Sequence, residues 1–305
     1  MPLSLSATPR QRYRVVAFIS VAQGVVMTEK SIDKREESLR VFSQTATIYD
    51  RIGPQIFSYF GQRLVDLADL GSGGKVLDVA AGRGAVLFPV AAKIGPTGHV
   101  TAIDFSPDMV RETAKDIESR KLSHAEIRHM DAEQMNLPDA SFDWVMCGFA
   151  LWMFAEPARV LQEFYRVLKR GGRVALSTWA ADNPSQTWCN EVLRPFVYAP
   201  AAKELPAKFD SRFDTSLQLE TALRRAGFAD TQISVKEKDF VYADEEQYWS
   251  SLWSAGFRRQ LEKITPDLLE QAKRAVCQKL QTFKKPDGFH KLNRALFAFG
   301  TKPAQ

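Results

Sequence analysis

The sequence predicts an α/β protein with a doubly wound, seven-stranded, mostly parallel sheet. From residue 74 onward, apolar runs of strand length alternate with amphipathic helical patterns, as they do in a parallel sheet with crossover helices. A turn with two glycines follows the first apolar run, at the end of a strand where such sheets bind their ligands. The 305 residues are 45% hydrophobic, which is enough to fill the core of one large domain with insertions.

The first part of this alternation is expected to contain five strands with helices between them. Ser106 suits the N-cap of the second helix, and Pro107 suits its first position. An amphipathic pattern predicts a further helix over 156–172, capped at its C-terminal end by Gly171. The five expected strands are residues 75–80, 99–105, 125–131, 142–150 and 172–180.

A helix over 219–228 and two strands over 231–242 and 294–302 complete the expected sheet. The remaining segments define the expected domain organisation. Residues 1–32 are expected to be a disordered or dispensable leader, residues 33–72 a helical N-terminal cap, and residues 73–305 the core. Two insertions are expected in the core: an irregular one at 183–216, which holds four prolines, and a helical lid at 243–292.

Composition excludes several classes of protein. Three widely spaced cysteines, Cys147, Cys189 and Cys277, form neither a disulfide framework nor a C-x-x-C metal pattern, so we expect a cytoplasmic protein without a metal. No apolar run approaches the roughly 18 to 20 residues of a membrane span. The net charge of +5 arises largely from residues 257–305, where eleven Lys/Arg outnumber four Asp/Glu. Without an interleaved aromatic groove this stretch indicates a solvated helix face, and nucleic acid is not expected as a partner.

The turn after the first strand carries an unusual acid. Asp78 lies four residues before Gly82, and Leu87 occupies the third glycine position of the dinucleotide-binding pattern G-x-G-x-x-G. A carboxylate would repel a pyrophosphate but would attract an ammonium or a sulfonium group. The turn therefore argues against a nicotinamide cofactor and favours a cationic ligand.

Four ordered blocks carry a family resemblance. The blocks are VLDVAAGRG, VTAIDFSPDMV, HMDAEQMNLPDASFD and EFYRVLKRGGRVALSTW. In this order they resemble class I S-adenosylmethionine-dependent methyltransferases, above all the ubiquinone/menaquinone-biosynthesis type and its small-molecule relatives. The resemblance is good over residues 40–180. It implies a Rossmann-like methyltransferase fold and methyl transfer to O, C or N of a small, largely apolar metabolite in secondary-metabolite or quinone/isoprenoid biosynthesis.

The resemblance also implies roles for single residues. Asp78 would bind the methionine part of S-adenosylmethionine, Asp104 both ribose hydroxyls, and Asp131 with Ala132 the adenine edge. Cys147 would flank the transferring methyl group as a small wall residue. The cofactor site would also include Ala80, Gly82, Gly84, Phe105 and Met109, with Ala80 in place of the family's first glycine.

The acceptor side is less specific. No charged residue occurs from Cys147 to Ala155, so the acceptor is expected to present an apolar or aromatic body to this wall. The candidate bases are Tyr49, His290 and Glu156, whereas His129 is expected to be structural. The expected substrate-pocket residues are Phe149, Trp152, Phe154, Trp249 and Trp253.

Two other functions and the oligomeric state stay open. An RNA or protein methyltransferase could use the basic C-terminal stretch, and a non-catalytic cofactor-binding regulator could share the fold. A homo-oligomer is compatible with the sequence.

Overall fold

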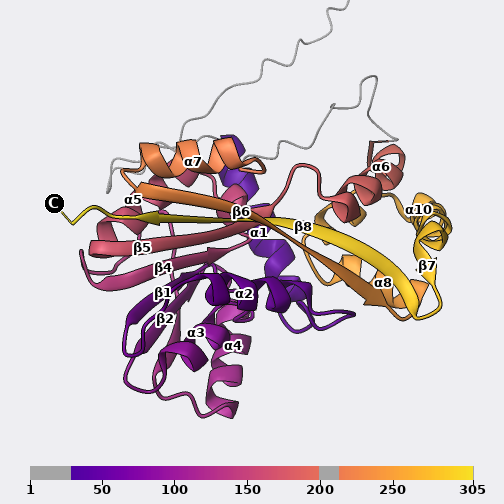
Figure 1. Ribbon diagram of the computed structural model, residues 1–305. Helices are drawn as coiled ribbons and strands as arrows, with labels where there is room; N and C mark the ends of the chain where they lie inside the picture. The colour runs from indigo at the N-terminus through magenta and orange to yellow at the C-terminus, as the bar shows by residue number, and fades with distance from the viewer. Residues whose placement is uncertain (1–28, 199–212, 305) are drawn as a thin grey trace, which may run out of the picture.

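The computed structural model describes residues 29–198 and 213–304 (Figure 1). The expected leader, apart from residues 29–32, lies outside the described residues. Among the helices that are described, none has the length and apolar character needed to cross a membrane.

One sheet organises the molecule, with the strand order β3-β2-β1-β4-β5-β8-β6. The five strands from β3 to β5 are parallel, and β8 runs antiparallel to both β5 and β6. The chain moves outward from β1 to β3 and returns at β4, so the switch point lies between β1 and β4. The strands are β1 Lys75–Val79, β2 His99–Asp104, β3 Ala125–His129, β4 Phe142–Gly148, β5 Leu168–Trp179, β6 Ala229–Tyr242, β7 Lys284–Lys285 and β8 Gly288–Thr301. The predicted fold class is confirmed, with β7 as a short addition that pairs with β8.

Helices cover both faces of the sheet, and the pleat of β1 shows which side chains meet them. Val76 packs in a cluster with α2 (Ile56–Leu67) and α3 (Leu87–Ile94), whereas Leu77 packs in a second cluster with α5 (Pro157–Val167) and α7 (Ser216–Arg225). Side chains alternate along a strand, so Asp78 lies on the face that α2 and α3 cover. The helix α4 (Pro107–Ser119) begins as expected, with the Ser106 hydroxyl accepting a hydrogen bond from Met109 N and with Pro107 in the first turn.

A helical lobe lies beyond one edge of the core, where β6 and β8 extend past the other strands (Figure 1). Here the lobe means the far ends of β6 and β8 with β7 and four helices. These are α6 (Pro184–Tyr198), α8 (Glu245–Trp253), α9 (Arg258–Leu261) and α10 (Pro266–Leu280), followed by the short η2 (Gln281–Phe283). The lobe has its own hydrophobic cluster. The first helix, α1 (Glu29–Thr45), contacts α4 of the core and α9 of the lobe.

Three expectations about single elements were wrong. The helix predicted over 156–172 ends at Val167, because Leu168 is extended and begins β5, so Gly171 is not a helix cap. The segment expected to be irregular contains α6, whose buried Trp188, Cys189, Leu193 and Val197 form one apolar stripe. The last strand begins at Gly288, inside the segment predicted as a helical lid, because Gly288 pairs with β7 and the residues from Phe289 onward pair with β6.

Candidate active site

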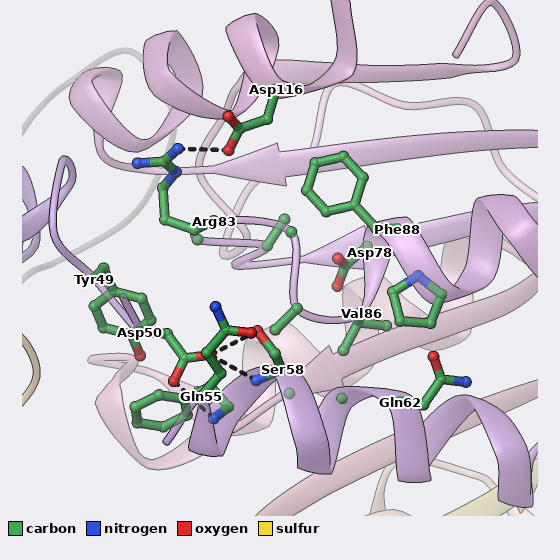
Figure 2. A pocket seen from close by; sticks show the side chains of 18 of the residues that line it. Tyr49, Asp50, Gln55, Ser58, Gln62, Asp78, Arg83, Val86, Phe88 and Asp116 are labelled. Atoms are coloured by element: carbon green, nitrogen blue, oxygen red, sulfur yellow. Dashed lines mark hydrogen bonds and ion pairs between the residues drawn. The ribbon is translucent and has the colours of Figure 1, made fainter. Parts of the chain in front are cut away.

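A cavity of about 450 Å³ lies at the carboxyl ends of β1 and β4 (Figure 2). Its volume falls within the usual range of small-molecule pockets. The turn after β1 forms one wall, α2 and the segment before it form another, and Gly148 and Phe149 close the end of β4. Asp78 lies at the base of this cavity, next to the switch point of the sheet.

Asp78 is a buried carboxylate without a partner. Its side chain is 1% exposed, and neither oxygen makes a hydrogen bond of normal geometry. Burial raises the pKa of Asp78 well above its ordinary value, and the N–H of Leu87 at the start of α3 opposes this shift. A buried charge without a partner is costly. The carboxylate is therefore placed to accept hydrogen bonds from a cationic ligand in the cavity.

The turn after β1 brings the backbone close to that ligand position. Ala80, Gly82 and Gly84 all have positive φ, at 55°, 50° and 80°. A Cβ at Gly84 would lie 2.4 Å from the ring of Phe88, so only glycine fits there without movement. Ala80 adopts the left-handed conformation at a cost of roughly 1 kcal/mol. Asp50 and Phe149 also line the cavity with positive φ, at 56° and 54°, so three non-glycine residues of the cavity have a strained backbone.

Asp104 ends β2 and holds the glycine turn. Its two carboxylate oxygens accept hydrogen bonds from Gly82 N and Ser106 N, both at 2.8 Å. Burial raises its pKa, and the N–H groups of Ser106 and Gly82 oppose the shift. Each oxygen keeps a second lone pair, so Asp104 can still accept a ligand hydroxyl.

The expected adenine end is covered by α1. Arg35 forms an ion pair with Asp131, and its guanidinium lies 4.9 Å from the ring centre of Phe105. Ala132 and Met109 are buried nearby, at 4% and 2% exposure. Apart from Cys147, the cofactor residues predicted from the sequence lie along the carboxyl edge of the sheet, and of these only Asp78, Ala80, Gly82 and Gly84 line the cavity.

Tyr49 lines the cavity in a different role from the one expected. Its ring stacks on Phe57 with centroids 5.1 Å apart and lies 4.0 Å from a Cβ built on Gly82. Burial raises the pKa of the phenol, and the carboxylates of Asp50 and Asp104 raise it further. The phenol therefore stays protonated at neutral pH and can donate a hydrogen bond, but it is not suited to be a base.

The aromatic wall is only partly the predicted one. Phe149 packs on Phe57 and on Trp179, at centroid distances of 5.5 and 4.4 Å, and it lines the cavity. Trp152 lies behind it, 6.4 Å from its ring centre, and Phe154 packs against the opposite cluster. Neither of these two side chains lines the cavity.

Cys147 is separated from the ligand position by the sheet itself. Its side chain packs in the cluster on the side of α5, on the opposite face from Asp78. Burial raises the pKa of its thiol, so it is not a nucleophile at neutral pH. Alternation along β4 requires only that Met146 and Cys147 face opposite sides, and the pairing of Met146 with Asp78 decides which of them shares the face of Asp78.

Four further candidates lie elsewhere. Trp249 and Trp253 pack in the lobe cluster, and His290 lines a separate lobe cavity. Glu156 is exposed at the start of α5. His129 is held by the carbonyl oxygen of Phe105 at 3.0 Å, as a structural residue would be. Within the described ranges, no cluster of His, Cys, Asp or Glu could hold a metal ion.

Sequence reasoning missed the polar residues that fix the cavity walls. Asp50 caps α2 by accepting hydrogen bonds from Phe57 N and from the N–H and hydroxyl of Ser58, and Figure 2 shows this arrangement. Arg83 of the glycine turn pairs with Asp116 of α4 and also donates to a carbonyl oxygen at the end of α1. An arginine between two glycines was a signal that could have been followed.

The basic C-terminal stretch is not a free surface. Six of its eleven Lys and Arg residues form ion pairs with acidic residues of the same chain. These six are Arg258, Arg259, Lys263, Lys273, Lys285 and Arg294. These ion pairs neutralise about half of the positive charge of the stretch.

Comparison with known proteins agrees with this geometry. A family model described as a methyltransferase domain matches residues 77–176. Nocamycin O-methyltransferase of Saccharothrix syringae is 32% identical over 237 residues, which cover 74% of this chain and 85% of that protein. The chain belongs to the methyltransferase family. The resemblance of the four sequence blocks is thereby confirmed, and the cofactor of this methyltransferase is S-adenosylmethionine.

Two other relatives match a shorter part. Aklanonic acid methyltransferase DauC of a Streptomyces species is 36% identical over 144 residues, and demethylmenaquinone methyltransferase of Listeria welshimeri is 35% identical over 147 residues. Each match covers 47% of this methyltransferase, but 66% and 62% of the relatives, so the chain spans less than two thirds of their length. A Bacillus halodurans structure assigned as a methyltransferase shares 25% identity with a TM-score of 0.54, covering 80% of this chain and 98% of its own.

The site fits S-adenosylmethionine on its own chemistry. The unpartnered, buried carboxylate of Asp78 needs a cationic partner, and the turn beside it leaves no side chain between backbone and ligand at Gly82 and Gly84. A ligand with an ammonium group at one end supplies the cationic partner for Asp78. The two glycines let the backbone lie close to such a ligand.

Proposed function

We propose that this methyltransferase transfers a methyl group to an oxygen of a small acceptor with an apolar or aromatic body, in secondary-metabolite or quinone biosynthesis. The observation that carries the proposal is the unpartnered carboxylate of Asp78 in a cavity whose opposite wall is aromatic. The names of the relatives support a small acceptor, since they refer to aklanonic acid, nocamycin and demethylmenaquinone.

The cofactor roles follow from the hydrogen-bonding capacity of each residue. When bound, S-adenosylmethionine supplies a methyl group on a positively charged sulfur. Asp78 would accept hydrogen bonds from its ammonium group, and Asp104 would accept from the ribose hydroxyls with the lone pairs that Gly82 N and Ser106 N leave free. Asp131 would meet the adenine edge once Arg35 has turned away from it. The ring of Phe105 and the buried Ala132 and Met109 would hold the adenine by contact.

The acceptor would lie against Phe57 and Phe149, with Tyr49 donating a hydrogen bond to its oxygen. In such a site the protein works by alignment and by exclusion of water. Tyr49 stays protonated, and His290 lines a separate cavity, so we do not assign a protein base. A phenolic or enolic acceptor suits this arrangement, because it reaches its anionic form more readily than an alcohol.

Methyl transfer can be measured directly. We would incubate the protein with S-adenosylmethionine labelled in its methyl group and with 2-naphthol, 1-hydroxyanthraquinone or a naphthohydroquinone, and count label in the organic extract. We expect labelled product and an equal amount of S-adenosylhomocysteine from at least one acceptor. Cofactor binding without label in any acceptor would favour the non-catalytic regulator instead.

The aromatic wall has its own test. Replacing Phe149 by Ala should raise the Michaelis constant for the acceptor, or lower turnover, about tenfold or more, while cofactor affinity changes by about threefold or less. Trp249→Phe in the lobe is the control and should change neither. An equal loss of cofactor affinity in Phe149→Ala would place Phe149 in the cofactor site.

We also propose a cytoplasmic location. All three cysteines are described and none forms a disulfide, which agrees with a reducing compartment.

A further inference from the structure

The lobe contains a second cavity, of about 790 Å³, which shares no lining residue with the first. It lies between α6, the end of α10, β7 and the lobe end of β8. Trp188 and Phe283 line it with aromatic rings, and Lys279, Lys284 and Lys291 line it with amines. The family model stops at residue 176, so nothing in that match assigns a role to this cavity.

Lys291 is the residue from which a bound ligand is inferred. It is 2% exposed, and its Nζ lies 3.6 Å from the ring centre of Trp188 and 4.3 Å from that of Phe283. Ring faces stabilise the positive charge, but they do not replace the hydrogen-bond acceptors that three N–H groups need. In the part of the chain that the structure describes, no oxygen or nitrogen accepts from Lys291 Nζ. The indole Nε1 of Trp188 is also buried without an acceptor.

The groups around Lys291 do not supply a counter-charge. Burial raises the pKa of the neighbouring thiol of Cys189 and of the phenol of Tyr248, so both stay neutral at pH 7. Three acids line the cavity: Asp182, Glu191 and Asp239. Asp239 is held by His290 at 2.6 Å and by Lys285 at 3.5 Å, and Asp182 pairs with Arg294. Among the described residues, none of the three forms an ion pair with Lys291.

Other lysines that line the cavity add further positive charge. Lys279 and Lys284 contact aromatic rings and form no ion pair among the described residues. Burial, together with the nearby Lys279 ammonium, lowers the pKa of Lys291 to about 7.

We propose that this cavity binds a small organic carboxylate with a planar apolar body. The carboxylate accepts hydrogen bonds from Lys291, and the planar body lies against Trp188 and Phe283. The carboxylate of such a ligand gives the buried N–H donors of Lys291 and Trp188 their acceptors, and its planar body covers the rings of Trp188 and Phe283. It binds outside the methyl-transfer cavity, so the protein has two ligand sites of opposite charge preference.

The probe is 2-naphthoate, and the uncharged 2-naphthamide is its matched analogue. Calorimetry at pH 6.5 should show one molecule of 2-naphthoate bound per chain, about tenfold or more tighter than 2-naphthamide, with quenching of tryptophan fluorescence. Lys291→Met should lose this preference, whereas Lys291→Arg should keep most of it. Lys115→Met on α4 is the control, because Lys115 pairs with Glu112 far from the lobe, and it should bind like the wild type.

The pH dependence separates Lys291 from its neighbours. The affinity of the wild type should fall about tenfold or more from pH 6.5 to 8.5 as Lys291 loses its proton, and Lys291→Met should show no such fall. His290 titrates nearby, so a fall that survives in Lys291→Met would assign the effect to His290 and overturn the proposal. Equal binding of both probes, or displacement of 2-naphthoate by S-adenosylmethionine, would also overturn it.

Discussion

Asp78 in the core and Lys291 in the lobe are two solutions to the same physical problem. Each is a buried ionisable group that lines a cavity. Neither oxygen of Asp78 has a hydrogen-bond partner of normal geometry, and Lys291 Nζ lies over the rings of Trp188 and Phe283. Asp78 lies in the segment that the family model matches, at the switch point of the sheet, whereas Lys291 lies outside that segment. The family model therefore covers the site of Asp78 but does not extend to the cavity of Lys291.

The two charges also affect the stability of the ligand-free protein in opposite directions with pH. The pKa of Asp78 is raised on folding, so stability falls as the pH rises above the ordinary carboxyl value of about 4. The pKa of Lys291 is lowered to about 7, so stability falls as the pH drops from about 10.4 toward 7. Both costs are removed by a ligand of the right sign.

The largest effect is expected from Asp78→Asn. Loss of the charge should weaken S-adenosylmethionine binding about 10- to 100-fold, which corresponds to a charge-assisted hydrogen bond of about 1.5–3 kcal/mol. The same change should stabilise the ligand-free protein by about 1–3 kcal/mol at pH 7, because asparagine, unlike the buried Asp78, does not have to take up a proton on folding. Calorimetry and urea unfolding measure the two effects.

Asp104→Asn is the matched control. Asp104 lies beside Asp78, but it accepts two backbone hydrogen bonds, so its replacement should destabilise the ligand-free protein. If both variants lost stability equally, Asp78 would have a partner in solution, and the comparison of the two acids would fail.

Lys291→Met tests the stability cost of the buried lysine in the lobe, as Asp78→Asn tests that of the buried acid in the core. We expect the variant to be more stable than the wild type by on the order of 3 kcal/mol at pH 6, with the difference shrinking steadily as the pH rises toward 10.5, where the lysine is neutral in the folded state and about half neutral in the unfolded state. The free energy of urea unfolding between pH 6 and pH 10 measures it. A difference that did not change with pH would mean that Lys291 packs in the lobe without titrating on folding.

Gly84→Ala tests how closely the glycine turn is fitted. Gly95→Ala is the control, because Gly95 also has positive φ, at 69°, but has no atom within 4 Å of the added Cβ. Gly95→Ala should cost about 1–3 kcal/mol of stability, because φ 69° with ψ −177° is a conformation that almost only glycine adopts. Gly84→Ala should cost about 1–3 kcal/mol more because of Phe88, and should weaken cofactor binding. Equal costs would show that Phe88 moves aside freely.

Arg35→Ala should have the smallest effect of these variants on the equilibrium affinity for S-adenosylmethionine. Arg35 pairs with Asp131 and Glu133 and covers Phe105, so α1 closes the expected adenine end of the site. Without Arg35, cofactor association and dissociation should both become faster, and the affinity should stay within about threefold of the wild type. Stopped-flow fluorescence measures the rates. Unchanged rates would mean that the cofactor enters without displacing α1.

The parts that could be predicted from the sequence are those that depend on local pattern. Alternating apolar runs gave the order of elements through β5, and the Ser106–Pro107 pair marked the start of α4. Asp78 and Asp104 could be recognised because each ends a strand beside the glycine turn. The boundaries at Val167 and Gly288 could not be predicted, since each depends on pairing with a strand distant in sequence.

The sequence by itself therefore determined the fold class, the family and the positions of the acids at the strand ends, because these depend on local periodicity and short motifs. Only the tertiary structure decided which side chains share a cavity. It placed Cys147 across the sheet from Asp78, since neighbouring strand residues face opposite sides. It also placed His290 in the lobe cavity, away from the cavity of Asp78, and enclosed Lys291 among rings from α6 and η2. Burial depends on what the rest of the chain packs against a residue, and no short stretch of sequence contains that information.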